Sequence, residues 1–289
     1  MPHQSNEKDV LREWRESAPY WAKHADTVRS MFAPITQALI EAGGIREGQA
    51  VLDVAGGAGE PSITIALVVG DSGSVVFTDA VAEMVLTARL EASKQASNQA
   101  SKQGRTNIAF NQCFAEALPF LSKSFDAVVC RLGIMLFPDP AAAIREALRV
   151  VRPRGSVSYA VWSTRDSNPF FHVVMDVVSR YIESPPEDPD APGAFRFAKR
   201  GELAKLLTDA GAIDVNERLR DFDLIAPLTP REFWSLRVEL SDTLRAKVAQ
   251  LTHEQLLRVE QEIEEAGRQF FVSGQMTFPA QVLIVSGRK

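Results

Sequence analysis

The stretch from Val51 to Ser62, with the sequence VLDVAGGAGEPS, decides the fold. An apolar segment typical of a buried strand ends near Asp53, and a turn with Gly56, Gly57 and Gly59 follows before a proline that can open a helix. Glycines let the backbone turn tightly and approach a ligand closely. The first amide groups of the helix face the same ligand. The stretch therefore predicts a strand–turn–helix unit that binds a nucleotide-type cofactor.

The glycine spacing separates two classes of cofactor. A dinucleotide fingerprint G-x-G-x-x-G that starts at Gly57 would need a glycine where the chain has Ser62. This disfavours a NAD(P)-dependent oxidoreductase, which stays open as an alternative. The residues Asp53, Ala55, Gly57 and Gly59 instead resemble the acidic-x-Gly-x-Gly-x-Gly motif of class I S-adenosylmethionine (SAM) dependent methyltransferases, with alanine in place of the first glycine.

A second predicted strand supplies a carboxylate for the same ligand. Ser74–Thr78 reads SVVFT and leads to Asp79, twenty positions after Gly59. A carboxylate at this place in a doubly wound sheet can accept hydrogen bonds from ribose hydroxyls. It could equally cap the next helix. The combination with the glycine turn favours the ligand, and we assign Ala80 and Met84 to the same site.

A third segment extends the resemblance. Residues 114–139, FAEALPFLSKSFDAVVCRLGIMLFPD, are similar to the DAEALPFPDNSFDAVV stretch of ubiquinone and menaquinone biosynthesis-type methyltransferases. In that family the leading acid contacts the adenine amino group, and this chain has Phe114 there. The resemblance implies that the Ala115 backbone amide contacts the ring. Glu116 is a candidate to substitute for the missing acid, although its neighbours are typical of an exposed turn. The resemblance also implies that Arg131 meets the methionine end through its backbone.

The resemblance covers about residues 44–162 and continues in LRVVRPRGSVSYAVW, Leu148 to Trp162, where Arg154 replaces a glycine. It implies an α/β, Rossmann-like, seven-stranded doubly wound sheet with an antiparallel last strand, plus a helical cap. It also implies SAM as cofactor, S-adenosylhomocysteine (SAH) as product and a small organic acceptor, quinol-like or aromatic. Because Phe114 replaces the acid and no base stands out, a non-catalytic SAM-binding sensor or assembly protein is the alternative.

Composition restricts the other possibilities. The chain has 289 residues, 45% hydrophobic and 24% charged, with a net charge of -5, which disfavours nucleic-acid binding. No apolar run approaches the roughly 20 residues that span a bilayer, and the polar N-terminus does not resemble a secretory signal. We therefore expect no membrane insertion and a cytoplasmic location. Cys113 and Cys130 lack metal-ligand spacing, so free thiols and no metal are expected.

The chain divides into four predicted regions. Residues 1–43 form an N-terminal helical lid, and 44–165 form the SAM-binding core. Residues 166–275 supply cap helices and a sixth strand, with a core helix and strand at about 200–226, and 276–289 hold the final core strand.

Capping residues predict three helices late in the chain. Thr229 with Glu232 and Thr252 with Gln255 form capping boxes, and Ser241 caps the helix between them. The last helix has an apolar stripe that can pack internally. The alternative is that this helical block forms a homodimer.

The sequence offers few residues for the acceptor and for proton transfer. Tyr20 and Trp21 in the lid, Trp162 at the end of the fifth strand and Arg196 beyond the connector are assigned to substrate. Each has a simple structural alternative in packing or surface solvation. The candidates for a general base are His24, His172 and Asp166.

Overall fold

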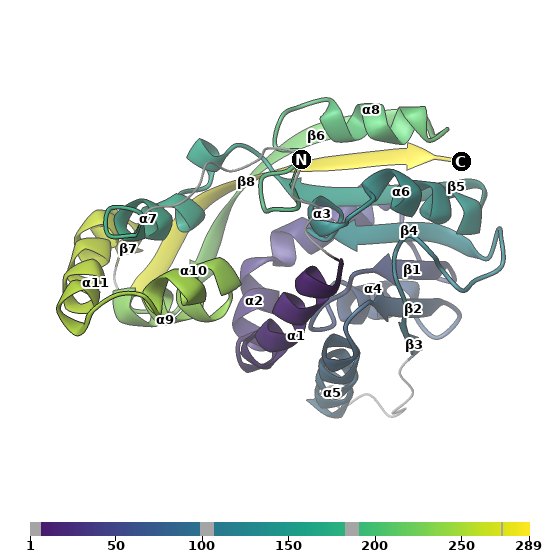
Figure 1. Ribbon diagram of the computed structural model, residues 1–289. Coiled ribbons are helices and arrows are strands. Elements are labelled where there is room, and N and C mark those ends of the chain that lie inside the picture. Colours follow the sequence, from purple (N-terminus) through teal and green to yellow (C-terminus); the bar gives the residue numbers. More distant parts are fainter. Residues whose placement is uncertain (1–6, 99–106, 183–190, 273) are drawn as a thin grey trace.

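The computed structural model describes residues 7–98, 107–182, 191–272 and 274–289. Its sheet has the strand order β3-β2-β1-β4-β5-β8-β6, and a short β7 pairs with β8 (Figure 1). The neighbours from β3 to β5 are parallel, whereas β8 runs antiparallel to β5 and β6. The strands are β1 Ala50–Val54, β2 Ser74–Asp79, β3 Ile108–Gln112, β4 Phe125–Arg131, β5 Val151–Trp162, β6 Ile213–Ala226, β7 Phe271–Val272 and β8 Gln275–Arg288.

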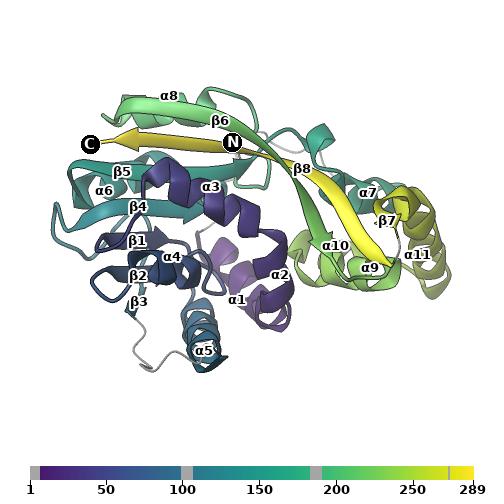
Figure 2. The same cartoon turned by 180° about the vertical axis from the view of Figure 1, so that it is seen from behind.

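Helices cover both faces of this sheet. α3 and α4 lie on one face (Figure 2), and α6 and α8 lie on the other (Figure 1). Short 3-10 helices occur at Ile134–Leu136, Arg165–Ser167 and Arg268–Phe270. The α-helices are α1 Glu7–Lys23, α2 Ala25–Met31, α3 Ala33–Gly43, α4 Ser62–Val69, α5 Ala82–Asn98, α6 Pro140–Val150, α7 Pro169–Val178, α8 Glu202–Asp209, α9 Pro230–Glu239, α10 Asp242–Val248 and α11 His253–Gly267.

The parallel strands form the buried centre of the core. Val51 and Leu52 in β1, like Val128 and Val129 in β4, are fully or almost fully buried, as expected for a sheet covered on both faces. The chain order reverses between β1 and β4, because β2 and β3 continue on one side and β5 on the other. Ligands bind at such a switch point, outside the carboxyl ends of the strands. The topology confirms the predicted doubly wound sheet with an antiparallel last strand.

β6 and β8 continue beyond the other strands as a two-stranded ribbon that carries α7, α9, α10 and α11 at its far end (Figures 1 and 2). Aromatic rings fill the space between the ribbon and these helices. Phe278 of β8 packs against Phe233 of α9 at 4.8 Å between ring centroids, and Phe170 of α7 lies 5.8 Å from Phe278. This packing continues the main hydrophobic core, because Phe233 and Phe278 belong to the same buried cluster as Val128 of β4.

The predicted caps occur where the sequence indicates. The Thr229 and Thr252 side chains accept hydrogen bonds from the backbone N–H groups of Glu232 and Gln255, in two complete capping boxes, and Ser241 caps α10. On α11, the apolar side chains of Val259 and Ile263 are buried. This helix packs on α7 and α9 within the cap. Homodimer formation through the apolar stripe of α11 stays a prediction.

β6 ends at Ala226 and β8 begins at Gln275. The two strands pair near these ends through Ala226↔Met276, and both of these side chains are buried. No described helix is long and apolar enough to cross a bilayer.

Candidate functional site

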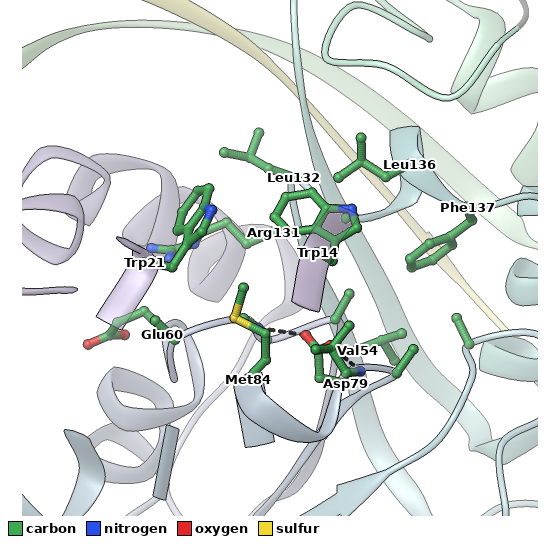
Figure 3. Close-up of a pocket in the computed structure, with 18 of the residues that line it drawn as sticks. Trp14, Trp21, Val54, Glu60, Asp79, Met84, Arg131, Leu132, Leu136 and Phe137 are labelled. Carbon is green, nitrogen blue, oxygen red and sulfur yellow. Dashed lines mark hydrogen bonds between the residues drawn. The ribbon is translucent and has the colours of Figure 1, made fainter. Parts of the chain in front are cut away.

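A cavity lies at the carboxyl ends of β1, β2 and β4, and α1 and α2 close it from the opposite side (Figure 3). Its volume is about 1250 Å³ including space open to solvent. A hollow outside the carboxyl ends of parallel strands is the usual place for a ligand in an open α/β sheet.

The glycine turn forms one wall through an unusual backbone. Ala55 and Gly57 both have φ of 56°, in the left-handed region. Alanine there costs roughly 1–2 kcal/mol, so the substitution of the first glycine is strained but compatible with the turn. At Gly56, a Cβ atom would lie 2.3 Å from the Phe77 ring, so only glycine fits. At Gly57, a Cβ would meet nothing within 4 Å.

Asp53 and Gly59 stand behind this wall and do not line the cavity. The Asp53 carboxylate is fully buried, and its Oδ2 accepts hydrogen bonds from the Ser62 backbone N–H at 3.1 Å and the Ser62 hydroxyl at 2.6 Å. Burial raises the pKa of Asp53 to about 7. The motif acid therefore supports the start of α4 instead of touching a ligand.

Asp79 lines the cavity and also holds the loops around it. Its Oδ2 accepts from the Gly57 N–H at 3.0 Å and its Oδ1 from the Val81 N–H at 2.9 Å, as the dashed lines in Figure 3 show. Burial raises the pKa of this carboxyl to about 6, although these N–H donors oppose the shift. The ligand and capping roles considered from the sequence are compatible, because each oxygen accepts more than one hydrogen bond. Ala80 and Met84 line the cavity beside Asp79.

The segment that follows β3 forms a further wall. Phe114, Ala115 and Glu116 all line the cavity, and Arg131 lines it from the end of β4. The Arg131 guanidinium is held by the Thr36 hydroxyl at 2.9 Å and lies over the Phe32 ring. Cys113 also reaches the cavity, but burial raises its pKa to about 11, so its thiol is neutral near pH 7.

The lid residues divide into two groups. Trp21 lines the cavity, and its ring lies 5.9 Å from that of Trp14, another lining residue. Tyr20 instead stacks against the Arg245 guanidinium of α10. His24 contacts Glu239 of α9 through its Nε2 atom. Tyr20 and His24 therefore connect the lid to the cap.

The remaining predicted residues lie away from the cavity lining. Trp162 is buried between Phe32 and Phe171. Arg196 is not a lining residue, but it donates to the backbone oxygen of Phe137, which lines the cavity, at 2.7 Å.

The two other base candidates are not brought to the cavity. His172 faces Asp176 on the same helix, with 3.3 Å between Nδ1 and Oδ2, and Asp166 is an exposed residue of a 3-10 turn. Within the described ranges, no histidine, lysine or tyrosine lines the cavity, and no group of three or more His, Cys, Asp and Glu residues could hold a metal ion.

Sequence reasoning missed several lining residues. Leu132, Leu136 and Phe137 follow β4 directly, and the rule that ligands bind beyond strand ends could have found them. Arg29 and Glu60 come from α2 and the end of the glycine turn, and they form an ion pair with 3.3 Å between Arg29 Nε and Glu60 Oε1. No local sequence pattern predicts this ion pair, because Arg29 and Glu60 are distant in the sequence.

Solved structures share the fold. The YcgJ protein of Bacillus subtilis has a TM-score of 0.53 at 20% identity, with 88% of this chain and 97% of that chain covered. Phosphoethanolamine N-methyltransferase 2 of Haemonchus contortus, solved in complex with SAM, has a TM-score of 0.53 at 14% identity, with 93% and 57% covered.

Curated relatives match more closely in sequence. An uncharacterized protein of Mycobacterium tuberculosis is 30% identical over 191 residues, which cover 65% of this chain and 64% of the relative. The ubiquinone/menaquinone biosynthesis C-methyltransferase UbiE of Hahella chejuensis is 38% identical over 140 residues, or 48% and 53% of the two chains. The matches thus span less than two thirds of these relatives. Residues 35–182 match the ubiE/COQ5 methyltransferase family, and the chain belongs to that family.

Proposed function

We propose that this protein transfers a methyl group from SAM to a small, largely apolar organic acceptor. The observation that carries the proposal is one continuous cavity that joins the glycine turn and Asp79 to an apolar wall at the end of β4. The family membership supports the cofactor. The acceptor class is inferred from the wall.

The described residues fit the cofactor. A Cβ at Gly57 would enter open space, so the backbone there can contact a ligand directly. The Asp79 carboxylate can accept from two ribose hydroxyls. Ala115, which the resemblance assigns to adenine, lines the same cavity. SAM would supply an electrophilic methyl group and its own leaving group.

The apolar wall favours an acceptor with a flat or aliphatic surface. Phe32, Leu132, Leu136 and Phe137 line this part of the cavity, and the Arg131 guanidinium lies over the Phe32 ring. The wall can orient such an acceptor and exclude water, which are the main contributions a protein makes to methyl transfer. A quinol-like or aromatic molecule fits, and the name of the UbiE relative supports the same class.

The described lining offers no evident general base. Asp79 is engaged by the loop N–H groups, and Glu60 faces Arg29. Glu116 accepts from the Asp139 N–H, and the Cys113 thiol is neutral. The acceptor should therefore react as an already ionised or otherwise electron-rich group. The same observation supports the second candidate, a SAM-binding protein without turnover.

Incubation with methyl-labelled SAM and a panel of quinols, phenols and aromatic amines tests the proposal. Labelled product, with Asp79→Ala as the inactive control, supports a methyltransferase. SAH binding without transfer to any member of the panel favours the sensor. Absence of SAH binding contradicts both functions.

The lid and cap are joined by a charged contact that should control cofactor exchange. The Glu239 carboxylate accepts from Lys23 Nζ at 2.7 and 2.8 Å and contacts His24. Glu239→Gln removes the charge, so we expect faster amide hydrogen exchange in α1 and dissociation of SAH several times faster. The stability loss should be about 1 kcal/mol or less.

Hydrogen exchange with mass spectrometry and stopped-flow release of SAH measure these effects. Glu254→Gln is the matched control, because it removes an exposed ion pair with Arg258 within α11. Unchanged exchange in α1 of Glu239→Gln would show that the contact does not hold the lid.

The raised pKa of Asp79 predicts a pH dependence of binding. Ribose hydroxyls donate to the ionised carboxylate, and protonation removes both the charge and acceptor capacity. With a pKa of about 6, affinity for SAH should fall as the pH drops through 6. The loss between pH 7.5 and pH 5 should reach roughly tenfold if only the ionised form binds.

Calorimetric titration with SAH across this range measures the effect. Asp79→Asn should bind weakly with a flat profile. A slope that persists in this variant would assign the titration to another group, such as Asp53, whose pKa burial raises to about 7.

A further inference from the structure

Three buried side-chain atoms without a hydrogen-bond partner belong to residues that line the cavity. They are Glu60 Oε1, Arg29 Nε and Trp21 Nε1. Buried polar groups are normally paired, so each such atom requires an explanation. Glu60 Oε1 and Arg29 Nε lie 3.3 Å apart as an ion pair, whereas the Trp21 donor faces no such group.

The surroundings of Glu60 favour a cationic ligand group. Its side chain is 6% exposed, and its Oε2 accepts from the Thr64 N–H at 3.3 Å. Oε1 lies 3.3 Å from Arg29 Nε, but the two atoms make no hydrogen bond. The terminal nitrogens of Arg29 already donate to Asp26 and Glu91. Three carboxylates thus share Arg29, which leaves Oε1 available to an additional donor.

Trp21 offers the complementary group. Its Nε1–H can only donate, and a buried donor without an acceptor is unfavourable. Trp21 and Glu60 both appear on the same side of Asp79 in Figure 3, and Phe137 lies on the other side. A ligand group that fits both atoms must offer a donor to Glu60 and an acceptor to Trp21, and the carboxylate charge of Glu60 favours a cationic donor.

The predicted adenine contact at Ala115 gives the direction of the cofactor in the cavity. Glu116, next to the predicted adenine contact, lies close to Asp139, whose N–H approaches Glu116 Oε1 at 3.4 Å. Asp139 follows Phe137 by two residues, so the adenine end adjoins Phe137. With the ribose on Asp79, the amino-acid end of the cofactor extends toward Glu60 and Trp21.

We propose that Glu60 and Trp21 bind the zwitterionic amino-acid group of the cofactor. Glu60 Oε1 accepts from the α-ammonium, and Trp21 Nε1 donates to the α-carboxylate. Arg29 positions the Glu60 carboxylate. The proposal rests on the proposed function and assigns Trp21 to the cofactor instead of the acceptor.

A pair of ligands isolates this contact. SAH carries the amino-acid group, whereas 5′-methylthioadenosine keeps the adenine, ribose and thioether and lacks that group. Calorimetric titration of the full chain with both ligands gives a preference ratio. We expect Trp21→Phe and Glu60→Gln each to lower this ratio about tenfold, because hydrogen bonds to charged groups are among the stronger ones. Affinity for 5′-methylthioadenosine should stay within about twofold.

Two control variants alter other lining residues of the same type. Trp14→Phe changes the neighbouring indole, and Glu116→Gln changes a carboxylate at the adenine end. Both should leave the ratio unchanged. Trp21→Phe keeps its ring, so it remains informative if Glu60→Gln does not fold.

The outcomes distinguish a failure of the Glu60 and Trp21 assignment from a failure of the proposed function. A wild-type protein that binds both ligands equally, or variants that lose both ligands in parallel, overturns the role of Glu60 and Trp21 while the cofactor site stands. A wild-type protein that binds neither ligand overturns the proposed function itself.

Discussion

Asp79→Ala is expected to weaken SAH binding by about 100-fold or more. The alanine removes an ionised acceptor for two ribose hydroxyls, and each hydrogen bond to a charged group is worth about 1.5–3 kcal/mol. Two such bonds correspond to about 3–6 kcal/mol, which is at least about 100-fold in the dissociation constant. The variant also leaves the Gly57 N–H without its acceptor. Disorder of the glycine turn would add to the loss.

Calorimetry with SAH measures the effect, and a thermal melt establishes that the variant folds. Asp126→Ala is a suitable control, because Asp126 also accepts a backbone N–H, from Ala50 at 2.8 Å. It lies at the start of β4, at the opposite edge of the sheet from the cavity. Its replacement should lower stability and leave SAH affinity unchanged. Near-normal affinity in a folded Asp79→Ala protein would contradict the ribose assignment.

The sequence predicted the core well because local signals and topology agree there. The glycine turn and the segment at Phe114 each follow a strand, and Asp79 is the last residue of another. The parallel sheet brings these strand ends to one edge. The predicted topology and helix caps were therefore confirmed. The glycines of the turn and the capping residues of the helices set the backbone geometry locally, with few contacts to distant parts of the chain.

The lid and cap were harder to predict, since helix orientation depends on tertiary contacts. Tyr20 and Trp21 are adjacent in the sequence, yet only Trp21 lines the cavity, because neighbours on a helix face different directions. Similarly, Arg29 and Glu60 meet only once α2 packs over the glycine turn. Apart from Arg29, the residues on α1 and α2 that line the cavity have the same apolar character as ordinary core residues. Their role therefore cannot be read from composition.

Asp53 illustrates how a motif residue can act at a distance from the ligand. It lies in the most recognisable stretch of the chain, yet it is buried behind the turn and fixes Ser62 at the start of α4. A Cβ on Gly56 would lie 2.8 Å from Asp53 Oδ2 as well as against Phe77. Gly56 is thus required for packing, and substitution there should disrupt folding before it affects binding.

Gly57→Val is expected to abolish measurable SAH binding while the protein still folds. The Cβ at this position enters open space in the cavity. The isopropyl group would therefore occupy volume that the cofactor needs, and 5′-methylthioadenosine should be excluded equally, unlike the effect of Trp21→Phe. The φ of 56° adds backbone strain, which costs roughly 1–2 kcal/mol of stability.

Gly44→Val distinguishes the effect of backbone strain on stability from the steric exclusion of the ligand that is expected for Gly57→Val. Gly44 has φ of 59° at the end of α3, and its Cβ would also meet nothing within 4 Å, but it does not line the cavity. Both variants should melt at lower temperature by similar amounts, and only Gly57→Val should lose the ligands in calorimetry. If Gly57→Val binds SAH normally, the cofactor does not contact the turn, and the strand–turn–helix unit has a structural role alone. Loss of binding in Gly44→Val as well would attribute the effect to general destabilisation.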